Sequence, residues 1–144
     1  MKHEFTSING TGLLRKCDPK GCGNFGASRG NHTHRGIDFH VIPNQQIKAP
    51  FPCTVNRYGY PYSDDSSYKL IEIVGTGAYS NYRAKIMYIN TFLSIGDKID
   101  KGDLLCTADD ITQKYGSEMT PHVHFELYVN NELVNPTNYF KNLV

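Results

Sequence analysis

All histidines of the chain except His3 fall in two short clusters. The first cluster places His34 four residues before Asp38, and the second places His122 two residues before His124. Imidazole and carboxylate groups are common ligands of zinc, and three protein ligands with an open fourth position are typical of catalytic zinc. A histidine in one cluster alone is more often a surface residue or a satisfied core residue, so the prediction of a metal site depends on the two clusters together.

Two predicted strands would position these groups. Residues 123–129 alternate apolar and polar side chains, and side chains two positions apart on a strand project to the same face. His122 and His124 therefore point to one side, close enough to serve a single site. Asp38 lies in the alternating segment 37–42, and His34 lies in the loop before it. This pair, together with one imidazole of the second cluster, supplies three ligands for zinc.

Further short strands, separated by turn residues, are predicted at 53–55, 68–74, 82–89, 104–106 and 132–134. The segment 95–103 contains glycines near both ends and is predicted to be a turn-rich connector. Residues 108–115 are predicted to form one or two helical turns, capped by Asp109 or Asp110. No long 3.6-residue periodicity occurs. We therefore predict an all-β fold with a minor α component and antiparallel strands.

The length of 144 residues fits one domain. Within that domain, residues 1–30 are rich in Gly, Lys and Asn and form a loop-rich N-terminal segment, while residues 31–144 form the main part. The composition, with 39% hydrophobic and 20% charged residues, is typical of a globular protein and not of a disordered tail. A net charge of +1 without a run of Lys or Arg argues against binding to nucleic acid or to an acidic membrane.

The four cysteines and the first residues bear on location. Cys17 and Cys22 enclose a Pro-containing turn and are predicted to form a disulfide. The rival interpretation is half of a structural zinc site, but such sites usually pair two clusters of this kind, and the sequence has one. Cys53 and Cys106 end apolar runs and are either buried free thiols or a second bridge. No stretch approaches the ~20 apolar residues of a membrane span, and the first residues lack the apolar core of a signal peptide. Either a leader has been removed, or another export route is used, or the protein stays inside; a disulfide favours an oxidising destination.

A family resemblance rests on two motifs. The segment 34–38, His-Arg-Gly-Ile-Asp, resembles the first signature of the lysostaphin and LytM-type zinc endopeptidases, and 121–126, Pro-His-Val-His-Phe-Glu, is similar to their second. The segments 47–50, 95–103 and 135–137 resemble the connecting and closing segments of the family. The likeness extends from about residue 25 to residue 139. It implies an antiparallel β-sandwich core whose loops form a zinc groove, and a hydrolase that acts on peptidoglycan stem or cross-bridge peptides.

The resemblance also implies a role for individual residues. His34, Asp38 and His124 would bind Zn²⁺, and His122 would be a catalytic histidine that faces the open metal position. The second catalytic histidine of the family corresponds to Asn90, which is expected to end a strand opposite His122. An amide cannot accept and return a proton near neutral pH as imidazole can, so this replacement predicts weakened activity.

The substrate would be contacted by Arg29, Tyr88 and His40. His32, His40 or Tyr88 would cover part of the missing proton-transfer role. Restoring a histidine by Asn90→His is expected to raise hydrolysis on the order of 100-fold if the groove is otherwise competent.

The chain also resembles the leukocyte cell-derived chemotaxin-like members of this fold, which are secreted vertebrate proteins regarded as zinc-binding non-enzymes. The likeness lies in 17–23, 85–89 and 122–124. Three hypotheses follow: a zinc endopeptidase of cell-wall peptides, an inactive zinc-stabilised module that binds cell-wall peptide or a protein partner, and a structural part of a phage or secretion apparatus. The first two place the protein outside the cytoplasm, either secreted or in the periplasm or cell wall.

Overall fold

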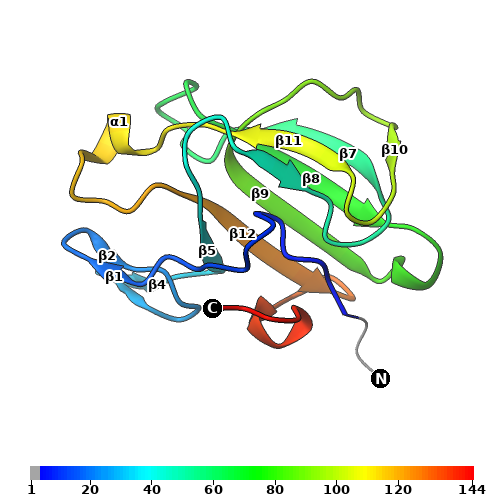
Figure 1. Cartoon of the computed structure of the whole chain (residues 1–144), viewed down its shortest axis with the longest axis horizontal. Coiled ribbons are helices and arrows are strands. Elements are labelled where there is room, and N and C mark those ends of the chain that lie inside the picture. The colour runs from blue at the N-terminus through cyan, green and yellow to red at the C-terminus, as the bar shows by residue number, and fades with distance from the viewer. Residues whose placement is uncertain (1–3) are drawn as a thin grey trace.

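An antiparallel sheet dominates the molecule (Figure 1). The computed structural model describes residues 4–144, and the sheet contains nine strands in this part of the chain. In chain order they are β5 (Ile37–His40), β6 (Gln46–Lys48), β7 (Cys53–Gly59), β8 (Lys69–Gly75), β9 (Tyr82–Asn90), β10 (Lys98–Ile99), β11 (Leu104–Ala108), β12 (His122–Val129) and β13 (Glu132–Val134). The predicted all-β fold with antiparallel strands is confirmed.

The long strand β9 has two successive partners on one of its edges. β8 pairs along the other edge, while residues 82–87 pair with β12 and residues 89–90 pair with β11. Tyr88 lies between these two pairings, so the sheet forks at this residue. β12 and β11 diverge from the fork, as Figure 1 shows for the orange and yellow strands.

The strand β12 separates the core from a polar face. Val123, Phe125 and Leu127 are fully buried, and they alternate with His122, His124 and Glu126. Phe125 packs against Phe39 of β5 with ring centroids 6.0 Å apart. Burying side chains of this size contributes roughly 1.5–3 kcal/mol each. The apolar alternation therefore fixes which way the histidines face.

Most predicted strands occur, with shifted ends. The segment 37–42 is a strand only as far as His40, and the strand that begins at Cys53 continues to Gly59. The connector 95–103 contains the two-residue strand β10, and β6 was not predicted at all. Strands of two or three residues are too short to show an alternating pattern.

The single helical turn of the segment 108–115 is α1 (Thr112–Tyr115). The N-cap residue is Ile111, not Asp109 or Asp110 as predicted, although Asp110 accepts a hydrogen bond from the backbone N–H of Thr112 at 3.0 Å. Two short 3-10 segments, η1 (Gly77–Tyr79) and η2 (Pro136–Tyr139), lie elsewhere in the chain. Within residues 4–144, no helix is long and apolar enough to cross a membrane.

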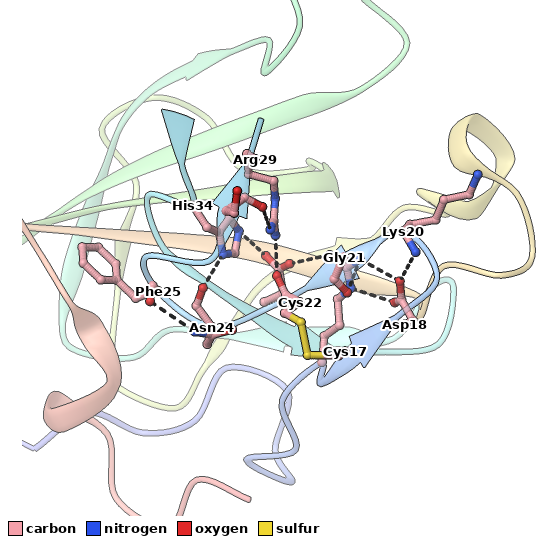
Figure 2. The surroundings of a disulfide bond; sticks show 12 residues. Cys17, Asp18, Lys20, Gly21, Cys22, Asn24, Phe25, Arg29 and His34 are labelled. Atoms are coloured by element: carbon pink, nitrogen blue, oxygen red, sulfur yellow. Dashed lines mark hydrogen bonds and ion pairs between the residues drawn. A yellow bond between two sulfur atoms is a disulfide. The ribbon is translucent and has the colours of Figure 1, made fainter. Parts of the chain in front are cut away.

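Two small hairpins that the sequence did not predict lie in the N-terminal segment and at its junction with the rest of the chain. The first consists of β1 (Cys17–Asp18) and β2 (Gly21–Cys22), and the second consists of β3 (Ser28–Arg29) and β4 (His32–Thr33). The predicted disulfide between Cys17 and Cys22 closes the first hairpin, which excludes the half zinc site (Figure 2). Residues 1–3 of the predicted segment 1–30 lie outside the described residues.

The remaining cysteines do not form a second bridge. Cys53 and Cys106 are both buried free thiols. Burial raises the pKa of the Cys53 thiol to about 12, so it is protonated at neutral pH. These two residues therefore belong to the core.

Candidate metal centre and active site

Paired strands β5 and β12 bring the two histidine clusters together. Asp38 lies directly opposite His124, and His40 lies opposite His122. Directly opposed residues of an antiparallel pair have side chains on the same face, with Cβ atoms about 4.5–5.5 Å apart. His34 arrives from the loop between β4 and β5. The predicted ligands His34, Asp38 and His124 therefore converge, and all three are buried.

The three converging atoms form a nearly regular triangle. His34 Nε2 lies 2.9 Å from His124 Nδ1 and 3.1 Å from Asp38 Oδ1, and the third side, from His124 Nδ1 to Asp38 Oδ1, is 3.0 Å. Ligands held about 2.0–2.1 Å from a tetrahedral zinc ion are roughly 3.3 Å apart. The triangle is thus close in size to one face of a tetrahedral zinc site, with the fourth position left open.

The outer nitrogens of both imidazoles decide which atoms face inward. His34 Nδ1 donates to the backbone carbonyl of Asn24 at 3.0 Å (Figure 2). His124 Nε2 donates to the carboxylate of Glu126 at 2.9 Å. In the neutral forms, the inner nitrogens of both rings therefore carry lone pairs. Three acceptor atoms in contact repel one another unless a cation lies between them, so the donor set fits a metal ion.

Glu126 belongs to a supporting chain of hydrogen bonds. Its carboxylate accepts from the hydroxyl of Tyr128 at 2.9 Å, and Arg35 donates to that hydroxyl at 3.2 Å. A carboxylate that holds the outer nitrogen of a ligand histidine fixes the tautomer and raises the basicity of the ring. Glu126 belongs to the second sequence motif, but no pattern in the sequence indicates this role.

Asp38 is held by a buried arginine that the sequence analysis did not identify. Arg15 Nη1 donates to Asp38 Oδ2 at 3.0 Å, and the same guanidinium makes two hydrogen bonds to Asp18. Asp38 therefore turns one oxygen toward Arg15 and the other toward the two histidines. The position of Arg15 in a loop-like segment gave no signal of this contact.

The electrostatics favour an ionised carboxylate among the three groups. Burial opposes the charge of Asp38, but hydrogen bonds from His124 and His34 outweigh it and hold the pKa of Asp38 well below its usual range. Burial also opposes a charge on His124. The hydrogen bonds with Asp38 and Glu126 outweigh that effect and raise the pKa of His124 to about 9. The centre thus attracts positive charge, which a proton or a metal ion can supply.

His122 lies beside the centre without joining the triangle. Its Nε2 is 3.5 Å from Asp38 Oδ2, and its Nδ1 donates to the backbone carbonyl of Thr120 at 2.8 Å. Burial lowers the pKa of His122, so the ring is neutral at neutral pH and Nε2 can accept a proton. This is the arrangement that a general base needs.

The cavity at the centre has a volume of about 560 Å³. One wall is basic and comes from the N-terminal hairpins and the loops around them, and the other is largely apolar and aromatic. Three groups of side chains line it. They are the basic residues Arg15, Lys20, Arg29 and Arg35, the apolar and aromatic residues Pro61, Tyr62, Met87, Tyr88, Ile111, Tyr115 and Met119, and the polar residues of the centre.

Asn90 ends strand β9, as the sequence predicts, but the structure does not bring it into the cavity with His122. It is exposed, it pairs with Thr107 of β11, and it is not among the described residues that line the cavity. Tyr88 lines the cavity instead, with its ring edge-on to His122 at 5.6 Å between centroids. A register shift in the pairing with β8, between Lys69 and Leu70, and a positive φ of 72° at Tyr88 accompany this change. The sequence gave no sign of the irregularity, because regular alternation would put 88 and 90 on one face.

Three other predicted residues have different positions. Arg29 and His32 line the cavity, and both belong to the second hairpin. His40 shares a strand face with Asp38 through the pairing with β12, but it is not among the described residues that line the cavity. The structure thus brings Arg29 and Tyr88 to the cavity and leaves His40 and Asn90 outside it.

Fold and metal ligands together define a metallopeptidase-like domain. The model of a family described as Peptidase family M23 matches residues 32–136, which is more than half of the chain. The chain therefore belongs to peptidase family M23, a family of metallopeptidases whose metal is typically zinc.

Individual relatives agree with this assignment. Leukocyte cell-derived chemotaxin-2 of Mus musculus is 31% identical over 127 residues, which are 88% of this chain and 78% of the relative. Among solved structures, the antimicrobial peptidase lysostaphin from Staphylococcus simulans aligns with a TM-score of 0.67 and 16% identity, over 96% of this chain and 53% of that one. A zinc-containing peptidase from Vibrio cholerae aligns with a TM-score of 0.62 and 17% identity, over 92% of this chain and 39% of that one.

The two bacterial structures establish the lysostaphin-type fold and no more, because their identities with this chain are low. The chain spans about half the length of the lysostaphin structure and about two fifths of the peptidase from Vibrio cholerae. The remaining parts of those proteins have no counterpart in the aligned region.

Proposed function

We propose that this chain is a zinc metalloendopeptidase that hydrolyses peptide bonds in the stem or cross-bridge peptides of peptidoglycan. One observation carries the proposal: a neutral His122 presents an accepting nitrogen beside three converging metal-ligand atoms, in an open cavity. A metal held only for stability would not require a proton acceptor at its side. The peptidoglycan substrate follows from the resemblance to the lysostaphin and LytM-type enzymes.

The residues of the centre would have two functions, metal binding and proton transfer. His34, Asp38 and His124 would hold the zinc ion, which supplies a Lewis acid that polarises a peptide carbonyl. His122 Nε2 would take the proton of the attacking water and pass it to the leaving amine, while Thr120 holds the ring in the required tautomer. General acid–base catalysis of this kind contributes typically 10²–10⁴-fold.

Tyr88 would take over part of the role of the family's second catalytic histidine, whose position in this sequence is Asn90. Its hydroxyl accepts a hydrogen bond from Tyr62 at 3.2 Å, and Tyr62 accepts one from Tyr115 at 2.8 Å. The proton of Tyr88 is then available to the cavity, where it would donate to the carbonyl oxygen of the substrate. Burial raises the pKa of Tyr88, so the hydroxyl keeps this proton.

The alternative is an inactive module that keeps the zinc for stability and binds cell-wall peptide or a protein partner. The position of the family's second catalytic histidine favours it, because Asn90 stands there and is not among the described residues that line the cavity, and Tyr88 cannot act as a base near neutral pH. The similarity to the chemotaxin of Mus musculus points the same way.

One experiment separates the two functions. Zinc-loaded protein is incubated with purified peptidoglycan, and the released fragments are identified by mass spectrometry. The matched control is His122→Ala, which should keep the metal and lose the base. New peptide termini that appear with the wild type and not with the control support the peptidase. Intact peptidoglycan in both, with protein bound to it, supports the binding module.

We also propose that the protein works outside the cytoplasm. The disulfide between Cys17 and Cys22 supports this location, because such bonds persist mainly in oxidising compartments.

A further inference from the structure

The basic wall of the cavity contains positive charge that the protein does not neutralise. Arg15 is fully compensated, because it forms ion pairs with Asp18 and Asp38. Among residues 4–144, no carboxylate forms an ion pair with Arg29 or Lys20, which line the same wall. The acidic groups of the cavity, Asp38 and Glu126, are both buried and already engaged with the histidines.

Arg29 is held firmly, and its charge is left available. One terminal nitrogen of its guanidinium donates to the backbone carbonyl of Cys22, and the other donates to that of Ser28 at 3.1 Å (Figure 2). A guanidinium has five N–H donors, so these two bonds leave donors for a ligand. The partner carbonyls are neutral, and one of them belongs to the disulfide hairpin. The group is therefore oriented without being neutralised.

The hairpin that carries Arg29 leads directly into the metal centre. Arg29 lies opposite His32, and two residues later the backbone N–H of His34 donates to the carbonyl of Ala27 at 2.8 Å. Gly21 of the first hairpin approaches both guanidiniums: a Cβ there would lie 3.5 Å from Arg29 Nη1 and 3.8 Å from Arg15 Nη2. Arg29 thus has a fixed position relative to the ligand His34.

We propose that Arg29 binds a carboxylate of the peptide that occupies the cavity. A planar guanidinium recognises carboxylate by paired hydrogen bonds, and the carboxylate is the only strong anion that an unmodified peptide carries. The site therefore selects peptides with a free carboxyl group near the bond presented to the metal centre. This inference rests on the proposed function for the peptide nature of the ligand, but it does not require that the peptide be cleaved.

The test compares two peptides that differ in one group. The first is L-alanyl-γ-D-glutamyl-L-lysyl-D-alanine with an amidated C-terminus, and the second also has a carboxamide in place of the α-carboxylate of its glutamyl residue, so that it carries no free carboxylate. Binding to zinc-loaded protein is measured by calorimetry at low and at physiological salt. The wild type should prefer the acid about tenfold, and added salt should reduce the preference, because partly exposed charges are screened. Equal affinity for the two peptides would overturn the proposal.

Two variants test whether Arg29 causes the preference for the acid peptide. Arg29→Gln should bring the two affinities to within about twofold of each other, whereas Lys98→Gln, which removes an exposed charge from the edge strand β10, should leave the preference intact. A preference that survives Arg29→Gln in folded protein would contradict the assignment. Arg29→Lys provides the second measurement if Arg29→Gln does not fold, because it keeps the positive charge and removes the planar fork that pairs with a carboxylate. It should lower the preference at least threefold, and a preference equal to that of the wild type would count against binding by the guanidinium.

The outcomes for binding and for hydrolysis separate. A preference for the acid that depends on Arg29, without release of fragments, would support the carboxylate site and contradict the proposed peptidase function. If both peptides bind with equal affinity and are hydrolysed at equal rates, the result would support the peptidase function and contradict the proposed carboxylate site.

Discussion

The β5–β12 ladder and the end of β9 both contribute residues to the cavity, but the strand pairing is regular in the ladder and irregular at the end of β9. In the ladder, Asp38 and His124 face each other in regular antiparallel register, and their neighbours Phe39 and Phe125 fill the core. At the end of β9 the register shifts, and Tyr88 takes a positive φ. In a regular strand, residues two positions apart project to the same face, so the sequence pattern predicts which residues face the site. An irregular residue interrupts this alternation, and the residue that a motif assigns to the site can then lie elsewhere.

Irregularities of this kind have a cost that the surroundings must offset. A non-glycine residue in the left-handed region costs of order 1–3 kcal/mol, and such residues cluster at functional sites. Tyr88 recovers stability through its stacking on Tyr62 and its edge-on contact with His122. The fork in the sheet thus presents an aromatic hydroxyl to the cavity in place of the side chain of Asn90.

The largest effect is expected from the ligands in the ladder. His34→Ala, Asp38→Ala and His124→Ala should each abolish stoichiometric zinc binding, because each removes one corner of the ligand triangle. His122→Ala should retain the metal, since its Nε2 lies outside the triangle. Elemental analysis of the purified variants measures this directly. A full complement of zinc in His124→Ala would contradict the assignment of the zinc ligands to the ladder.

The end of β9 allows a paired test of Tyr88 and Asn90. Tyr88→Phe removes the hydroxyl and keeps the ring, so hydrolysis should fall about 10- to 100-fold while zinc content and thermal stability change little. The effect should appear mainly in kcat. Asn90→His should change the rate less than threefold, since position 90 is exposed and outside the cavity.

The opposite result is equally informative. A large gain from Asn90→His would mean that residue 90 reaches the open metal position, as the family motif alone predicts. In the absence of wild-type hydrolysis, the same variants are compared by the affinity of a phosphinate peptide, whose tetrahedral anion resembles the oxyanion that Tyr88 would stabilise.

These residues also show how much of the site the sequence can predict. The spacing of His122 and His124 and the alternation around them were sufficient to predict a strand with both imidazoles on one side. The pairing of that strand with β5 required the three-dimensional structure, as did the bulged position of Tyr88. Arg15 could not be predicted at all, because its contact with Asp38 joins segments 23 residues apart without any periodic pattern.

The fold divides in the same way. The longer strands were predicted because an apolar alternation of five or more residues exceeds what chance produces. The hairpins β1–β2 and β3–β4 have two-residue strands, and the segment that contains them was predicted as loop. Only the Cys17–Cys22 spacing indicated order there. The basic wall of the cavity therefore came from the part of the sequence with the weakest pattern.

A smaller effect is expected from Asp18, which supports the ladder from that wall. It pairs with Arg15 and accepts a hydrogen bond from the backbone N–H of Thr120 at 2.8 Å. Asp18→Asn should reduce the free energy of unfolding by about 2–3 kcal/mol at pH 7, because Arg15 is left with one carboxylate partner. Urea denaturation measures this loss.

The pH dependence of that difference follows from the pKa of Asp18. The hydrogen bonds from Arg15 lower this pKa, so the carboxylate contributes stability that is fully present above its ordinary value near 4 and is lost as the pH falls through the lower folded value. The difference between wild type and Asp18→Asn should therefore shrink below about pH 4. A difference that stays constant with pH would mean that the charge of Asp18 is not the cause.

The smallest effect on the metal centre is expected from the disulfide. Replacing Cys17 and Cys22 together by serine should lower the free energy of unfolding by about 2 kcal/mol, because a six-residue loop is no longer closed in the unfolded chain. Zinc affinity should fall less than tenfold, since Asp38 and His124 are positioned by the β5–β12 ladder and its core. Arg15, Gly23 and Asn24 also hold the ligands, through hydrogen bonds that do not involve the disulfide. Denaturation and competition with a chelator measure the two quantities on the same protein. A loss of affinity well above tenfold would show that the hairpin β1–β2, and not the ladder alone, orders the zinc ligands.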